Sequence, residues 1–184
     1  MPTIVNQRSR YFIVTALVVL LATAFKGCPK CLVGQEIVIP SSDGTPPSVT
    51  MDFILPNGNT ITVTPGSTTS TVPVPGGGEV TVIVNAKDSE GVKDAQIWAA
   101  KVTWTIDPNT GAATRSGPET LGAPTASNAD SGSPGKKGCT QRLVSQTLVV
   151  RSTPRGRVSY EISARGFNFG GGDVRTPLVT LQAQ

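Results

Sequence analysis

Apolar and polar side chains alternate along much of the chain beyond residue 47. Over residues 49–55 the odd positions are apolar (Val49, Met51, Phe53 and Leu55), while positions 50 and 52 are polar. The same period of two recurs over residues 79–86 and 158–165. Successive side chains of an extended chain point to opposite faces, so each run predicts a strand with one buried face.

A hairpin is predicted directly after the first of these runs. Leu55 is followed by Pro56-Asn57-Gly58-Asn59, and alternation resumes over residues 60–64. Asn-Gly between two alternating runs is a strong hairpin signal, because both residues accept a positive φ.

The longest strand is predicted after the turn at residues 87–91, with regular alternation over residues 98–106. Its even positions form one predominantly apolar face, made of Trp98, Ala100, Val102, Trp104 and Ile106. If this face points inward, the two tryptophans belong to the core, and we favour that interpretation. If it points outward, the same rings form a platform on which sugars stack.

Loops and turns separate these runs. Residues 107–138 are dense in Ser, Thr, Pro, Gly, Ala and Asn and are expected to form a long loop. Two further strands are predicted over residues 143–150 and 178–183, with a glycine turn at 170–172 before the second. About seven strands without a convincing helix predict an all-β domain, an antiparallel sandwich or a barrel.

The N-terminus carries the features of an export signal. Arg8 and Arg10 precede an apolar run from Tyr11 to Phe25, which is shorter than the roughly 20 residues of a spanning helix. Residues 1–27 are therefore expected to be a helical signal peptide, and residues 28–46 a tether before the domain at 47–184. The signal peptide can be processed in two ways: by cleavage after Ala24, or by lipoprotein processing with a lipid on Cys28. Either predicts a protein exported to the cell envelope.

Three cysteines leave one without a partner in an exported chain. If Cys28 carries a lipid, Cys31 and Cys139 remain as a disulfide pair. The alternative is a local Cys28–Cys31 bridge with Cys139 free. The chain has no histidine, so zinc would lack a fourth ligand, and no βαβ pattern follows the C-x-x-C sequence as a redox motif requires.

The net charge of +4 arises largely from the leader, whose 27 residues hold three basic side chains and no acid. Residues 32–135 hold four basic and ten acidic side chains, and residues 136–184 hold eight and two. We favour neighbouring strands with complementary charges over a basic face that meets an anionic surface or glycan. No RRM, KH or OB motif accompanies the arginines, so nucleic acid is not an expected partner.

Two segments resemble bacterial immunoglobulin-like or fibronectin-like domains. Residues 80–97 resemble strand B, a D-x-x-G-V turn and strand C, while residues 158–170 and 178–181 resemble strands F and G. The resemblance covers residues 47–184 and implies an immunoglobulin-like sandwich, with Tyr160 near the start of strand F as a tyrosine corner. Such domains occur as spacers, adhesion modules and accessories of enzymes.

The sequence offers no catalytic apparatus. Without histidine, neither a Ser-His-Asp nor a Cys-His arrangement can form, and we expect neither an enzyme nor a cofactor. Asp88, Glu90 and Asp94 form the only dense acidic group. We interpret it as a solvated turn, with a weak calcium site as the alternative.

Candidate ligand contacts gather near the glycine turn. Phe167 and Phe169 precede Gly170, and Arg165 and Arg175 lie nearby in the sequence. We therefore predict a non-enzymatic exported interaction module, tethered to the membrane by lipid at Cys28, whose partner is another protein or an envelope glycan. The alternatives are a surface adhesin or glycan-binding domain, and a structural subunit of an envelope assembly that pairs its edge strands.

Overall fold

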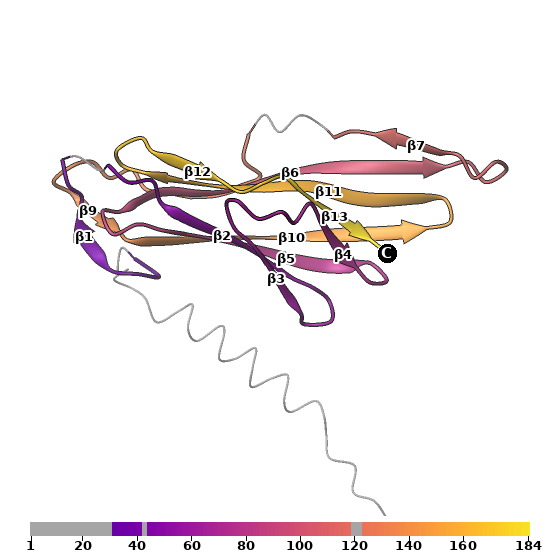
Figure 1. The fold of residues 1–184 in the computed structure, drawn as a ribbon, viewed down its shortest axis with the longest axis horizontal. Coiled ribbons are helices and arrows are strands. Elements are labelled where there is room, and N and C mark those ends of the chain that lie inside the picture. Colours follow the sequence, from indigo (N-terminus) through magenta and orange to yellow (C-terminus); the bar gives the residue numbers. More distant parts are fainter. Residues whose placement is uncertain (1–30, 42–43, 119–122) are drawn as a thin grey trace, which may run out of the picture.

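The computed structural model describes residues 31–41, 44–118 and 123–184. The expected signal helix, its cleavage site and Cys28 lie outside these residues. The described part consists of strands and connecting turns (Figure 1), and it contains no helix able to span a bilayer. The all-β prediction is confirmed.

The strands are more numerous than the sequence pattern predicts. They are β1 (Glu36–Val38), β2 (Ser48–Ile54), β3 (Thr60–Val63), β4 (Thr71–Val74), β5 (Gly78–Lys87), β6 (Val92–Ile106), β7 (Ala113–Ser116), β8 (Ala126–Ala129), β9 (Lys137–Cys139), β10 (Gln141–Thr153), β11 (Gly156–Asn168), β12 (Asp173–Arg175) and β13 (Val179–Ala183). The additional strands are short, and β7 and β8 lie within the segment 107–138.

Eleven of these strands form one mixed sheet, while β1 and β9 form a separate two-stranded sheet. The main sheet runs in the order β3-β2-β5-β10-β11-β13-β4, and β6 pairs with the other edge of β11. The pairing of β13 with β4 is parallel. The sheet curls into a nearly closed barrel, so that β2, β5 and β10 lie opposite β6 and β11 (Figure 1).

Strand β10 connects the two sides of this barrel. Its residues 141–150 pair with β5, and its last three residues, Arg151 to Thr153, pair with β11. Beyond that point β11 pairs with β13 and then β12 along the same edge. The two long strands therefore diverge from their hairpin, and the core fills the space between them.

The core follows the predicted alternation. Val49, Met51 and Phe53 are buried on β2, and every second residue of β5 from Val80 to Ala86 is fully buried. On β11 the buried partners are Ile162 and Ala164. Burying one large aliphatic or aromatic side chain contributes roughly 1.5–3 kcal/mol, so this shared interior holds the two sides of the barrel together.

The β2–β3 hairpin forms as predicted, but its turn differs in detail. Gly58 adopts a φ of 84° and donates its N–H to the Leu55 carbonyl at 2.9 Å. Among the described residues only glycines have a positive φ, so Asn57 does not. The loop is longer than a two-residue turn, and only its last residue, Gly58, needs a left-handed conformation to match the twist of the two strands.

A candidate binding face on strands β6 and β11

The tryptophans of β6 lie outside the core. Ala95 and Ile97 are fully buried members of the core cluster, and Trp98 and Trp104 are half-buried and belong to the opposite side of the strand. The assignment of the two tryptophans to the core was wrong, and the predicted alternation holds only in part, because the buried side of β6 changes along the strand. Beyond Ile97 the buried residues are Ala100 and Val102, 4% and 2% exposed, which lie on the tryptophan side but outside the core cluster. Ala95 and Ile97 take the place of the tryptophans in the core because they face Ala164 and Gly166 of β11, which belong to the barrel interior.

We call the side of β6 and β11 that points away from the core the outer face. The antiparallel register pairs Trp98 with Ser163 and Trp104 with Arg157. Between these pairs lie two more, Ala100 with Glu161 and Val102 with Ser159. Directly opposite residues of an antiparallel pair have adjacent side chains, so a serine lies beside each ring. Ser163 is fully buried and Ser159 is 6% exposed, so the part of this face between the two rings is largely covered.

An ion pair crosses the outer face between the two tryptophans. Arg115 of β7 lies opposite Trp104 and forms a salt bridge with Glu161 of β11. The register places this bridge diagonally over Val102, which is only 2% exposed although it lies outside the core cluster. The Arg115 guanidinium also lies 5.8 Å from the centre of the Trp104 ring, a favourable cation–π geometry.

Trp98 is held by a short chain of hydrogen bonds along β6. Its indole Nε1–H donates to Gln96 Oε1 at 2.9 Å, and Gln96 Nε2 donates to Asp94 Oδ2 at 2.6 Å. Burial raises the pKa of Asp94, against the opposing effect of the Gln96 hydrogen bond. These bonds fix the orientation of the Trp98 ring on the outer face.

Three of the four predicted contact residues come together on this face. Arg165 lies over the ring of Phe167, 4.5 Å from its centre, and forms an ion pair with Asp173 at 2.7 Å. Arg175 pairs with Arg165 across β11 and β12, and its Nη2 donates to Ser163 Oγ at 3.0 Å. Arg165, Phe167 and Arg175 thus extend the tryptophan face toward β12.

Phe169 lies elsewhere. A Cβ atom added at Gly91, Gly132 or Gly138 would lie 3.2–3.4 Å from its ring atoms, so the ring packs among three glycines near β1 and β9. A bulge between Phe167 and Asn168 breaks the alternation and separates the two phenylalanines. Phe169 therefore fills the end of the barrel and does not join the other contact candidates.

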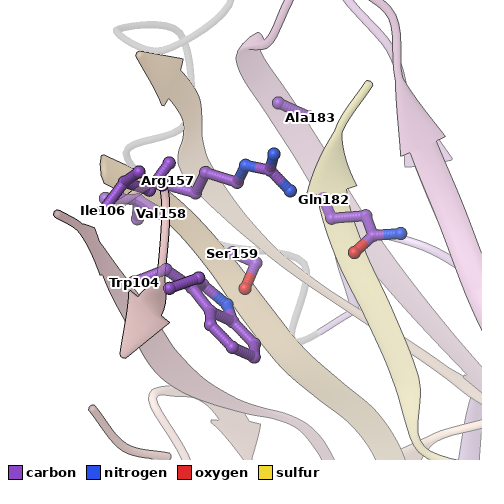
Figure 2. A pocket seen from close by; sticks show the side chains of 9 residues that line it. Trp104, Ile106, Arg157, Val158, Ser159, Gln182 and Ala183 are labelled. Carbon is purple, nitrogen blue, oxygen red and sulfur yellow. The ribbon is translucent and has the colours of Figure 1, made fainter. Parts of the chain in front are cut away.

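A pocket of about 200 Å³ opens at one end of the outer face. Its lining includes Trp104 and Ile106 of β6, Arg157 and Ser159 of β11, and Gln182 of β13. Figure 2 shows Arg157 extending toward Gln182, with Ser159 between Gln182 and the Trp104 ring. The pocket exists because β13 pairs with β11 only as far as Tyr160 and Leu181 and then follows β4.

The turn that borders this pocket is held by Asp107. Its Oδ1 accepts the backbone N–H groups of Asn109 at 2.7 Å and Thr110 at 3.1 Å. These hydrogen bonds lower the pKa of Asp107, because they stabilise the charged carboxylate. The carboxylate is therefore engaged within its own turn.

The acidic group does not form a metal site in the described part of the chain. Asp88 Oδ1 accepts the backbone N–H of Glu90 at 2.8 Å, which is the geometry of a turn, and Asp94 bonds Gln96 on β6. No cluster of three or more acidic, cysteine or histidine side chains able to hold a metal ion occurs among residues 31–41, 44–118 and 123–184. The contact of Asp88 with Glu90 is that of a turn, as predicted, but the turn is not solvated at this residue, because Asp88 is only 8% exposed.

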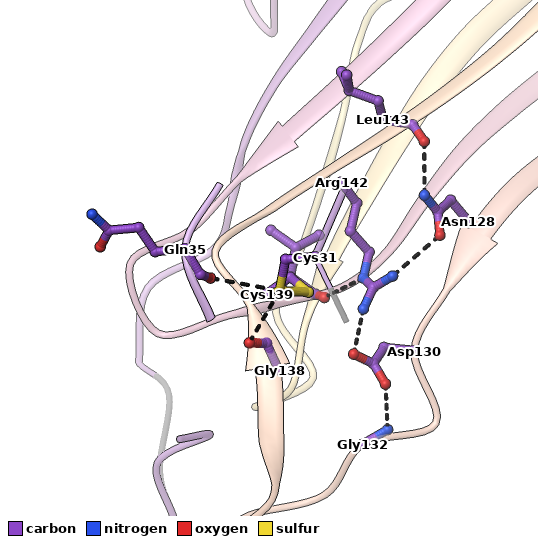
Figure 3. A network of polar contacts seen from close by, with 10 residues as sticks. Cys31, Gln35, Asn128, Asp130, Gly132, Gly138, Cys139, Arg142 and Leu143 are labelled. Atoms are coloured by element: carbon purple, nitrogen blue, oxygen red, sulfur yellow. Dashed lines mark hydrogen bonds and ion pairs between the residues drawn. A yellow bond between two sulfur atoms is a disulfide. The ribbon is translucent and has the colours of Figure 1, made fainter. Parts of the chain in front are cut away.

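The strongest polar network surrounds Arg142 of β10 (Figure 3). Its guanidinium forms a salt bridge with Asp130, and the two side chains are 9% and 7% exposed. Its Nε donates to the Val92 carbonyl at 2.9 Å and its Nη1 to Asn128 Oδ1 at 3.1 Å. Asn128 belongs to β8, which pairs with β6 over Asp94 to Ile97, so the network fixes the edge of the sheet beside Trp98.

A disulfide joins Cys31 to Cys139 beside this network, with a Cα–Cα distance of 5.5 Å (Figure 3). This is one of the two pairings that the sequence leaves open. The bond ties the start of the described chain to β9, which pairs with β1. Lys137 of β9 also forms an ion pair with Glu36 of β1 at 2.6 Å, and the hydrogen bond to Glu36 raises the pKa of Lys137.

Charge complementarity between the two halves of the chain is visible in these ion pairs. Arg115–Glu161, Lys137–Glu36 and Arg142–Asp130 each join a residue before position 136 to one after it. The arginines Arg151, Arg155 and Arg157 are exposed. Lys137–Glu36 and Arg142–Asp130 join a base of the C-terminal half to an acid of the N-terminal half, whereas Arg115–Glu161 joins the reverse combination. These pairs therefore neutralise only a small part of the charge asymmetry in the sequence.

Comparison with known proteins gives no family. No protein-family model matches the chain, and no curated protein matches it. Among solved structures it is similar to Spo0M, a sporulation control protein from Bacillus subtilis, with 16% identity and a TM-score of 0.27. The similarity covers 74% of this chain and 50% of Spo0M, so the chain spans half of that protein, and so weak a likeness carries no argument about function.

Proposed function

We propose that this protein is a non-enzymatic, exported interaction module with an immunoglobulin-like fold, and that the outer face of β6 and β11 binds its ligand. The observation that carries the proposal is that both tryptophans lie outside the core, on a sheet face flanked by arginines. Tryptophan and arginine are the residues most enriched at binding hot spots. A folded domain that needed them only for stability would bury them.

The strand order supports an immunoglobulin-like topology. If β5 and β6 correspond to strands B and C, then β5 lies between β2 and β10 as B lies between A and E. On the other side β11 lies between β6 and β13, as F lies between C and G. The four-residue strand β3 and the strands β7, β8 and β12 are additions to that order.

A glycan is the ligand that the outer face favours. Sugars present flat apolar faces surrounded by hydroxyl groups, which match half-buried indole rings flanked by polar groups. Gln96 beside Trp98 and Ser159 in the pocket beside Trp104 supply such polar groups, whereas Ser163 is fully buried.

The proposal predicts that alanine at Trp98 or Trp104 weakens ligand binding about ten-fold or more. Lys101→Ala is the matched control, because Lys101 is exposed on the opposite side of the same strand. Binding is measured on an array of envelope saccharides, and folding by urea denaturation. An array ligand whose affinity responds equally to the alanine substitutions at 98, 104 and 101 would place the binding site elsewhere.

The membrane tether is a separate proposal, supported by the leader and by the cysteine pairing. With Cys31 bonded to Cys139, Cys28 is the cysteine that remains for lipid attachment. We expect Cys28→Ser to release the protein from the membrane fraction and to abolish metabolic labelling with a fatty acid. Retention of the variant in membranes would exclude a lipid on Cys28.

Assembly through edge strands has less support. The main sheet path ends at β3 and β4, each of four residues, and β4 contains Pro73. Short edges and proline are the features by which sheets avoid pairing with other chains. A structural subunit that polymerised by strand addition would need a longer free edge.

A further inference from the structure

The pocket beside Trp104 contains polar groups that have no hydrogen-bond partner in the described part of the chain. In the described part of the chain, the guanidinium of Arg157 has neither a hydrogen bond nor an ion pair. Arg115, Arg142 and Arg165, in contrast, each pair with a carboxylate. The Ser159 hydroxyl, the Trp104 indole N–H and the Gln182 amide likewise have no hydrogen-bond partner among the described residues.

These groups converge on one space. Arg157 and Trp104 are direct register partners on β11 and β6, so the guanidinium and the ring rise from adjacent positions. Ser159 follows two residues later on the same side of β11, and Gln182 faces it from the diverging strand β13 (Figure 2). A cleft with an apolar wall and a few converging polar groups is the usual form of a small-ligand site.

The volume and the charge of the pocket limit the kinds of ligand that it can bind. A volume of about 200 Å³ lies below the roughly 300–1,000 Å³ of sites for drug-sized molecules, so it accepts a single ring. Arg157 is the one charged side chain in the lining that the structure describes. Its planar guanidinium matches a carboxylate by two parallel hydrogen bonds.

We propose that this pocket binds one uronic-acid ring of an anionic saccharide, with the ring against Trp104 and its carboxylate on Arg157. Ser159 and Gln182 then bind ring hydroxyls, and the rest of the saccharide continues over the outer face toward Trp98. The inference rests on the proposed function and adds to it the charge of the ligand. It also gives a role to Arg157, whose positive charge is not paired with a carboxylate in the described part of the chain.

The test compares two probes of equal size on the exported protein: a disaccharide that contains glucuronic acid, and its counterpart with glucose in that position. Binding is followed by tryptophan fluorescence and by calorimetry. We expect the acidic disaccharide to bind at least ten-fold more tightly than the neutral one. Arg157→Gln should abolish this preference, while Arg151→Gln, a change at an exposed arginine outside the pocket, should preserve it.

Two results would overturn the inference. If both disaccharides bind equally well and Trp104→Ala weakens the binding of both, the outer face binds glycans as proposed, but the pocket does not select a uronic-acid ring. If neither disaccharide binds, while an aspartate-containing peptide binds in an Arg157-dependent manner, the pocket recognises an acidic peptide and the saccharide assignment fails. Because Arg157 is exposed, the Arg157→Gln variant should fold as the parent does, and urea denaturation checks this.

Discussion

Replacing Arg142 by alanine is expected to lower the free energy of unfolding by about 3–5 kcal/mol. The substitution leaves the carboxylate of Asp130, 7% exposed, without its cation, and it removes the hydrogen bonds to the Val92 carbonyl and to Asn128. An uncompensated buried charge costs far more than the loss of a surface pair. Urea denaturation at neutral pH measures the effect.

The matched control is Arg115→Ala, which removes an ion pair whose arginine is 42% exposed. Its effect on stability should be below about 1 kcal/mol, because exposed pairs contribute little. A second variant, Arg142→Met with Asp130→Leu, removes both charges together and should recover most of the lost stability. An Arg142→Ala protein as stable as the parent would show that the two groups are not buried together.

This network also matters for the candidate binding face. Asn128 links the Arg142 guanidinium to the Leu143 carbonyl, to which its Nδ2 donates at 2.8 Å. Because β8 pairs with β6 next to Trp98, loss of the network should loosen the edge of the outer face. We therefore expect the Arg142→Ala variant to weaken ligand binding at Trp98 as well as stability.

Removing the disulfide is the second change with a large expected effect. Cys31 and Cys139 are 108 residues apart in sequence, and a loop of this length contributes about 4–5 kcal/mol in the chain-entropy model, whose mechanism is disputed. The double variant Cys31→Ala and Cys139→Ala, made in a Cys28→Ser background to prevent thiol exchange, should lose about 3–5 kcal/mol of stability. Urea denaturation under oxidising conditions measures the loss.

Reduction provides the control for this prediction. The Cys28→Ser parent treated with dithiothreitol should unfold at the same urea concentration as the double alanine variant. The variant itself should not respond to the reductant. Equal stability of the oxidised and reduced parent would mean that the bond does not form in solution, and peptide mapping would then identify the free thiols.

The sequence predicts the strands well because their alternation is local. Val49 to Phe53 and Val80 to Ala86 bury the residues expected from a period of two, and Asn57-Gly58 marks the hairpin. Which side of β6 faces the core could not be predicted in the same way. Both sides of this strand carry apolar residues, so the choice between Ile97 and Trp98 for the core depends on which residues of β11 lie opposite.

The candidate site was predicted in part. Arg165, Phe167 and Arg175 come together because β12 folds back on β11 after the glycine turn, while the bulge at Asn168 removes Phe169. Nothing in the sequence around Arg115 or Gln182 predicts that they belong to the candidate site. Arg115 reaches the outer face only through the pairing of β7 with β6, and the pocket depends on where β13 leaves β11.

The central claim is that both tryptophans of β6 lie on an outward-facing surface available to a ligand. Acrylamide quenching of the single-tryptophan variants Trp98→Phe and Trp104→Phe tests it without knowledge of the ligand. We predict that each remaining indole is quenched in the folded protein, less than in urea but well above a buried ring. If neither indole is quenched until the protein unfolds, the tryptophans are core residues and the binding face does not exist.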